Sequence, residues 1–272
     1  MLSGSINENT RVTRIYRNTN GSFSDANVPL LGVSDGTSAW VDYDNDGDLD
    51  LFVSGARSMN VDLAAKLYRN DSGTFVDTNT TLPGVYGSGI AWGDYDADGD
   101  ADVVITGSTG YDFIGRLYRN TAGAFSDSGI SLPGVQSGAV AWGDYDQDGD
   151  LDLALTGSTP SGADVSRIYR NDSTPRNLPP VAPGGLTAIP TKTGATLAWS
   201  AASDQETPAA ARIGNAHHRR SWTISGLQPG QTYYWSVQAI DAGFAGSPFA
   251  LEGTVTHGSA ADVFSYLPLA QR

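Results

Sequence analysis

The chain of 272 residues contains no cysteine and only three histidines. The absence of cysteine excludes disulfide bonds, haem attached through thioether links and zinc sites built on thiolates, although it leaves the compartment open. The histidines His217, His218 and His257 give little support for catalysis, because two adjacent histidines point to opposite faces of a strand. No Ser/His/Asp arrangement or phosphate-binding glycine loop can be assembled around them. We therefore predict that the chain is not an enzyme.

The sequence also lacks long hydrophobic runs. The first thirty residues contain no apolar stretch long enough for a signal peptide, and no segment is apolar enough for a transmembrane helix. Helical periodicity is absent as well, so we expect an all-β protein. These observations predict no membrane insertion. If the protein is exported, we expect this chain to be a fragment that has lost its start.

Positive charge is scarce, with 16 Lys and Arg residues against 30 Asp and Glu residues and a formal net charge of −14. Half of the acidic residues lie in three loops at 42–50, 94–102 and 144–152, and without these loops the charge would be +1. Residues 1–172 carry a net charge of −15, and residues 173–272 carry +1. Negative charge in ion-sized clusters argues against a nucleic-acid partner. The difference between the two parts predicts two domains.

Each acidic loop has aspartate at its first, third, fifth, seventh and ninth positions and glycine at its sixth. Like charges this close repel one another by about 1 kcal/mol per pair even in water, so bare turns without metal are a poor alternative. A hard divalent cation that takes about six to eight oxygen ligands suits such a loop, and glycine permits the sharp bend around it. The loops therefore predict calcium, about three ions in all. The candidate ligands are Asp42, Asp44, Asp46, Asp48, Asp50, Asp94, Asp96, Asp98, Asp100, Asp102, Asp144, Asp146, Asp148, Asp150 and Asp152.

Around the loops the sequence repeats about every 50 residues. Trp40, Trp92 and Trp142 precede the three loops, and a phrase of the form Arg/Lys-Ile/Leu-Tyr-Arg-Asn recurs four times. Each unit reads as four short strands, which is the size of a propeller blade. The predicted blades span residues 36–80, 88–128 and 138–171, with a half blade at 11–28.

The strand context separates these loops from an EF-hand. An EF-hand needs flanking helices and a bidentate glutamate at its twelfth position. Here the twelfth position is Val53, Ile105 or Leu155, each within an apolar strand. The sequence therefore predicts a calcium loop within a β-hairpin.

At these residues the chain resembles a known family. The phrase Trp-Gly-Asp-Tyr-Asp-x-Asp-Gly-Asp-x-Asp, followed by an apolar strand and Thr-Gly, is similar to the FG-GAP/VCBS repeat, the blade of the integrin α-type propeller. The resemblance covers residues 11–172. It implies that side chains at positions 1, 3, 5 and 9 hold calcium, while position 7 contributes its carbonyl. Because family propellers usually close with more blades than the three found here, we expect an open or partial propeller, either a fragment or an arc completed by other copies.

The remainder of the chain has a different character. A Pro/Gly linker at 173–184 leads into alternating segments at 185–257, where Leu227-x-Pro-Gly-x-x-Tyr233 resembles the tyrosine corner of a fibronectin type III domain. Few residues separate Trp199 from Leu227, so we expect a small, truncated and incomplete β-sandwich. The tail at 258–272 carries no pattern that can be interpreted.

Two functions from different classes remain open. The first is a non-enzymatic calcium-binding repeat module of a secreted or cell-surface protein, with a structural, adhesion or protein-interaction role. The second is an accessory carbohydrate-binding module of an extracellular enzyme whose catalytic domain lies outside this chain. The predicted partner is an extracellular protein or carbohydrate, because loops of this kind fill where calcium reaches about 0.1–1 mM.

The aromatic and basic residues near the loops distinguish these functions. The three tryptophans either pack between blades or line a sugar-binding surface, and the first interpretation is favoured. The loop tyrosines Tyr43, Tyr95 and Tyr145 are expected to shield the ions. Arginines in the Tyr-Arg-Asn phrases are expected to pair with neighbouring acids rather than with an acidic ligand, at Arg69, Arg119 and Arg170.

Overall fold

The computed structural model describes residues 1–7, 10–58, 62–172, 178–191, 193–203, 212–213, 220–239 and 247–257. The described residues form β-strands and no helix, which confirms the predicted all-β class. Consistent with this, they include no helix that is long and apolar enough to cross a membrane. They divide into two compact units, the first built on the described residues of 1–172 together with 212–213, and the second on the other described residues from 178 onward. The predicted tail at 258–272 and the pair His217 and His218 lie outside the described residues.

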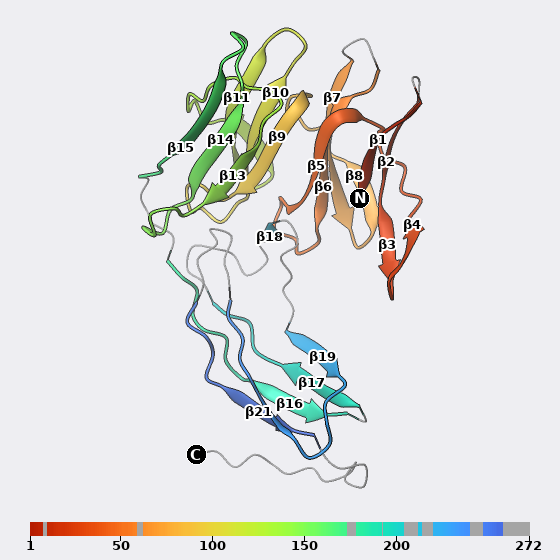
Figure 1. The fold of residues 1–272 in the computed structure, drawn as a ribbon, viewed down its shortest axis with the longest axis vertical. Helices are drawn as coiled ribbons and strands as arrows, with labels where there is room; N and C mark the ends of the chain where they lie inside the picture. Colours follow the sequence, from red (N-terminus) through yellow and green to blue (C-terminus); the bar gives the residue numbers. More distant parts are fainter. Residues whose placement is uncertain are drawn as a thin grey trace. The chain divides into compact units, whose positions relative to one another are not determined.

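Three antiparallel blades make up most of the first unit, and they stand side by side in chain order (Figure 1). Blade 1 has five strands in the order β18-β5-β6-β7-β8. These are β5 (Ser34–Asp42), β6 (Asp50–Ala56), β7 (Leu63–Asp71), β8 (Thr74–Asp77) and β18 (Arg212–Ile213). Blade 2 has four strands, β9 (Tyr86–Gly93), β10 (Asp102–Ser108), β11 (Phe113–Thr121) and β12 (Ala124–Asp127). The described part of blade 3 has three strands, β13 (Val140–Gly143), β14 (Asp152–Ser158) and β15 (Asp164–Tyr169).

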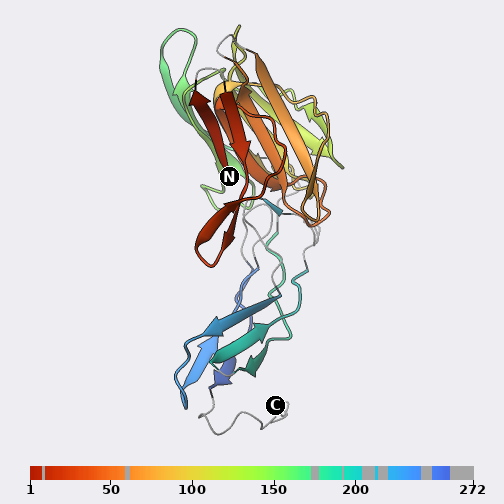
Figure 2. The same cartoon turned by 90° about the vertical axis from the view of Figure 1, so that its right-hand side faces the viewer.

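Two hairpins precede blade 1 and correspond to the predicted half blade. They are built from β1 (Leu2–Asn7), β2 (Thr10–Arg14), β3 (Tyr16–Thr19) and β4 (Ser22–Asp25). Tyr16 pairs with Asp25 in the register that joins Tyr68 to Asp77 in blade 1, and the β3-β4 hairpin projects from the unit (Figures 1 and 2). The strand β1 pairs with β2 and extends this half blade beyond the range expected from the sequence.

Each blade buries its apolar residues against the next blade. Phe52 of β6 lies with its ring centroid 5.8 Å from that of Trp92 in β9, and Trp92 in turn contacts Phe125 of its own blade. Trp142 stacks on Tyr95 of blade 2, with centroids 6.5 Å apart. Burial of these rings between sheets stabilises the array by roughly 25 cal/mol for each Å² removed from water. The predicted packing role is confirmed for Trp92 and Trp142.

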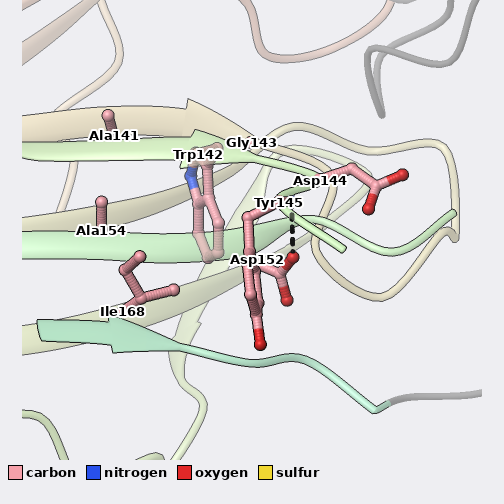
Figure 3. Close-up of a pocket in the computed structure, with 8 residues that line it drawn as sticks. All are labelled: Ala141, Trp142, Gly143, Asp144, Tyr145, Asp152, Ala154 and Ile168. Carbon is pink, nitrogen blue, oxygen red and sulfur yellow. Dashed lines mark hydrogen bonds between the residues drawn. The ribbon is translucent and has the colours of Figure 1, made fainter. Parts of the chain in front are cut away.

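In blades 1 and 2, one face packs against the blade that follows. In the described part of the chain, the equivalent face of blade 3 is open. A Cβ atom added to Gly93 of blade 2 would lie 2.6 Å from the Trp142 ring, whereas one added to the equivalent Gly143 would meet nothing within 4 Å. On the same face Ile168 is 61% exposed and Tyr145 is 55% exposed. A cavity of about 180 Å³ lies there, between the apolar side chains and Asp152 (Figure 3). The strands of the first unit therefore form an open array.

The second unit contains two small sheets around one apolar cluster. One sheet has the order β16-β17-β19, and the other pairs β20 with β21. The strands are β16 (Thr187–Pro190), β17 (Gly194–Ala198), β19 (Ser221–Ser225), β20 (Thr232–Trp235) and β21 (Gly253–Thr256). Leu197 and Val255 share the cluster, and the Tyr233 hydroxyl accepts the backbone N–H of Gln228 at 2.8 Å. The fibronectin type III resemblance of this unit stays a prediction.

Candidate metal centre

Each acidic loop joins the first two strands of a blade and bends through two residues with positive φ. The glycines at the sixth position, Gly47, Gly99 and Gly149, have φ angles between 91° and 98°. Such values are accessible to glycine without steric cost. The fourth position is also left-handed, at Asn45 (58°), Ala97 (55°) and Gln147 (62°), which the sequence did not reveal. Asparagine favours this conformation, but alanine and glutamine do not.

The bend brings three carboxylates of each loop together. In each loop the aspartates at positions 1, 3 and 9 offer oxygen atoms that all lie within 4.8 Å of one another. The groups are Asp42, Asp44 and Asp50; Asp94, Asp96 and Asp102; and Asp144, Asp146 and Asp152. Three oxygens at this separation could hold a metal ion.

Backbone donors orient the first and ninth positions. Asp102 receives the N–H of Tyr95 at Oδ2 (3.1 Å) and the N–H of Asn120 at Oδ1 (2.7 Å). The same pattern recurs at Asp50 and Asp152. The first aspartate of each loop accepts the N–H of the glycine at position 6, for instance from Gly99 to Asp94 at 2.8 Å. These bonds fix the carboxylates without using all of their lone pairs.

The fifth and seventh positions lie outside the groups of three. The fifth-position Asp98 accepts the N–H of Asp100 at Oδ1 and pairs with Arg119 at Oδ2, both at short distances. The seventh-position Asp100 turns its Oδ2 toward the N–H of Ala122, in the hairpin between β11 and β12. Loop 1 has the same backbone contacts, because Asp46 accepts the N–H of Asp48 and Asp48 accepts the N–H of Ser72. The predicted ligand role of the fifth-position side chains, at Asp46, Asp98 and Asp148, therefore stays a prediction, as does the carbonyl role at Asp48, Asp100 and Asp150.

Arginines neutralise part of the charge of loops 2 and 3. Arg119 bridges Asp96 and Asp98 at 2.8 Å each, and Arg170 bridges Asp146 and Asp148 at 3.1 and 3.2 Å. Arg69 instead pairs with Asp71 at 2.9 Å. The expectation that these arginines pair with neighbouring acids is confirmed.

In loops 1 and 2, burial makes several carboxylates difficult to ionise. Loss of water around them raises the pKa of Asp50 and Asp94 to about 7 and that of Asp102 to about 8. Burial, followed by repulsion from the next aspartate of the loop, also raises the pKa of Asp44 and Asp96. A buried negative charge of this kind needs a compensating positive charge.

Two buried oxygens support the fit to a cation. Oδ1 of Asp96 and Oδ1 of Asp146 have no hydrogen-bond partner, although the Oδ2 atoms of both residues are paired with arginine. Both residues belong to the groups of three, and a metal ion would satisfy these atoms. In loop 3, Asp152 accepts the Tyr145 N–H at 2.9 Å, and Asp144 extends from the end of β13 (Figure 3). Oxygen-only donors of this kind suit calcium better than zinc or copper.

The loop tyrosines pack against the following blade, and the expectation that they shield the ions stays a prediction. Tyr43 is buried and its ring centroid lies 6.2 Å from that of Phe125 in blade 2, while Tyr95 stacks on Trp142 of blade 3. These rings thus contact the following blade. Tyr145, which faces the open side of blade 3, is exposed.

Sequence reasoning missed the function of the asparagine that ends each Tyr-Arg-Asn phrase. Asn120 is fully buried, and its Nδ2 donates to the carbonyls of Tyr43 (2.8 Å) and Ala101 (3.1 Å). Asn171 donates to the Tyr95 carbonyl at 2.8 Å. The phrase was visible as a repeat marker, but nothing in its spacing indicated contacts with the loop of the preceding blade.

Comparison with known proteins identifies the repeats. Residues 42–105 and 94–155 each match the family model described as an FG-GAP-like repeat. Each match begins at the first aspartate of a loop and ends in the second strand of the following blade, so it includes two acidic loops. The two matches together cover less than half of the chain. No curated protein matches it.

Proposed function

We propose that residues 11–172 are a non-enzymatic, calcium-stabilised repeat module of a secreted or cell-surface protein, with a structural, adhesion or protein-interaction role. The single observation that carries this proposal is the threefold recurrence of the carboxylate group at positions 1, 3 and 9 on matched backbone supports. The match to FG-GAP-like repeats, a non-catalytic type of module, agrees with it.

The role of the ion in this proposal is structural. Bound calcium would supply the positive charge that the buried carboxylates need, held in loop 2 by Asp94, Asp96 and Asp102. The chain's own residues orient these carboxylates through the N–H groups of Tyr95, Gly99 and Asn120. Because loops 1 and 2 contact the blade that follows them, filling these loops would stabilise the array.

The carbohydrate-binding alternative is not favoured. It depends on tryptophans that are free to stack on sugar rings, but Trp92 is only 5% exposed and Trp142 stacks on Tyr95. Trp40 lies against the cluster formed by Val33, Leu51 and Val53, and its ring contacts Phe75.

A calcium titration by calorimetry, with thermal melting in chelator alongside, tests the proposal. We expect about three ions to bind, and chelation to lower the melting temperature of the blades while sparing the second unit. The variant Asp96→Asn should weaken binding in loop 2, whereas Asp112→Asn, at an exposed turn outside the loops, should leave binding unchanged. Absence of binding, or equal effects of the two variants, would refute the proposal.

A further inference from the structure

The three acidic loops are joined by a continuous relay of hydrogen bonds. In loop 1 the Tyr43 N–H donates to the ninth-position Asp50 at 3.1 Å, and the Tyr43 carbonyl accepts from Asn120 Nδ2 at 2.8 Å. The backbone N–H of Asn120 then donates to Asp102, the ninth position of loop 2, at 2.7 Å. Only two residues therefore separate the ninth-position carboxylates of adjacent loops.

The same relay continues into blade 3. The Tyr95 N–H donates to Asp102 at 3.1 Å, and the Tyr95 carbonyl accepts from Asn171 Nδ2 at 2.8 Å. The Asn171 N–H donates to Asp152 at 2.8 Å. The phrases that end in Asn120 and Asn171 thus each orient a carboxylate of their own loop and also contact the backbone of the preceding loop.

Loops 1 and 2 have a second connection. Asn45, at the fourth position of loop 1, donates through Nδ2 to Asp100 Oδ1 (2.8 Å) and to the Gly99 carbonyl (3.2 Å) of loop 2. The fourth position of loop 2 is Ala97, whose side chain has no donor for loop 3. Asn45 and Ala97 have nearly the same backbone conformation, with φ angles of 58° and 55°. At this loop position the two junctions therefore differ by one side chain on a matched backbone conformation.

From this geometry we infer that the loops bind calcium cooperatively, and that loops 1 and 2 are coupled more strongly than loops 2 and 3. The inference rests on the proposed function. Ordering of one loop fixes the tyrosine carbonyl and the Asn45 amide, which hold the next loop in the conformation that binds. The neighbouring loop then requires less ordering of its own when it fills. Such coupling is reciprocal, so a broken bridge weakens both loops by the same factor.

The amide resonances of Gly47, Gly99 and Gly149 report each loop separately, because each N–H donates to the first aspartate of its own loop. Titration of the full chain with calcium chloride, followed by nuclear magnetic resonance, gives one midpoint for each loop. The variant Asn45→Ala should raise the calcium concentration at the midpoints of Gly47 and Gly99 together, by about fivefold, a value at the lower end of typical coupling between linked sites. The Gly149 midpoint should move less.

Two further variants make the test independent of damage to loop 1. Ala97→Asn places the missing donor at the junction of loops 2 and 3, so it should lower the Gly99 and Gly149 midpoints together. Gln147→Ala is the matched control, because Gln147 occupies the same loop position on blade 3, where no described blade follows. It should leave all three midpoints unchanged.

The outcomes separate this inference from the proposed function. If Asn45→Ala moves the Gly47 midpoint alone, or if Ala97→Asn moves only that of Gly99, the coupling is absent although calcium binds. If no glycine resonance responds to calcium in the unsubstituted chain, the proposed function itself fails and the coupling fails with it.

Discussion

Removal of the Asn120 side chain should destabilise the protein far more than removal of the exposed Asn18 side chain, which ends another copy of the same phrase. The substitution Asn120→Ala deletes three hydrogen bonds, to the carbonyls of Tyr43 and Ala101 and from the N–H of Gly123. The residue is 0% exposed, so water cannot replace the lost partners. A net loss of roughly 1 kcal/mol for each bond, with the added cost of buried unsatisfied groups, gives about 3–5 kcal/mol.

The chain offers a matched control for this variant in the half blade. Asn18 ends the same Tyr-Arg-Asn phrase and makes the same turn bond, from the Gly21 N–H at 2.9 Å, but it is exposed. Asn18→Ala should therefore cost less than about 1 kcal/mol. Asn70, which adds one bond to the Leu49 carbonyl, should give an intermediate value.

Urea unfolding, monitored by hydrogen exchange at the amides of β10 and β11, measures these losses of unfolding free energy. Tryptophan fluorescence alone would mix the two units, because the second unit contains Trp199, Trp222 and Trp235. If Asn120→Ala and Asn18→Ala lower the free energy of unfolding equally, the contact between blades does not contribute as described here.

Three further predictions concern packing and charge. Gly93→Ala should cost about 1–3 kcal/mol of unfolding free energy, because its Cβ would overlap the tryptophan ring of blade 3. Gly143→Ala, where a Cβ meets nothing within 4 Å, should be neutral. Equal urea midpoints for the two variants would contradict this. Phe52→Ala should cost about 3–5 kcal/mol, because the ring is fully buried, whereas Phe23→Ala, where the residue is 70% exposed, should cost below about 0.5 kcal/mol in the same urea assay. In chelator, the pKa of Asp102 lies near 8 in the folded chain against an ordinary value of 3.8, so the folded state retains a proton that the unfolded state releases between these values. Stability should then fall as the pH rises from about 4 to about 8, and a higher urea midpoint at the upper end of that range would refute the assignment.

The sequence allowed the repeat architecture to be predicted because its signals are local. The apolar runs around Val53, Ile105 and Leu155 indicated strands, and the spacing of aspartates around Gly47, Gly99 and Gly149 indicated tight loops.

What could not be predicted depends on contacts between blades. The contact from Asn120 to Tyr43 joins residues 77 positions apart, and the phrase around Asn120 is the same as that around Asn18, which makes no such contact. The left-handed conformation at Ala97 and Gln147 was also hidden, because neither residue type favours it. The ring contacts of Tyr43 and Tyr95 with the next blade were hidden as well, because they join residues far apart in the chain.

Because one face of blade 3 is open, we expect local unfolding to begin in blade 3 before it reaches blade 2. Blade 2 shares apolar clusters with neighbours on both sides, whereas the described part of blade 3 shares one with blade 2 alone. In a linear array with only nearest-neighbour contacts, the local opening free energy is lowest at the unit with the fewest shared interfaces. Blade 3 should therefore exchange its amide hydrogens before blade 2. Its detachment would expose Val104 and Leu117 of blade 2, so that each opening weakens the next blade in turn.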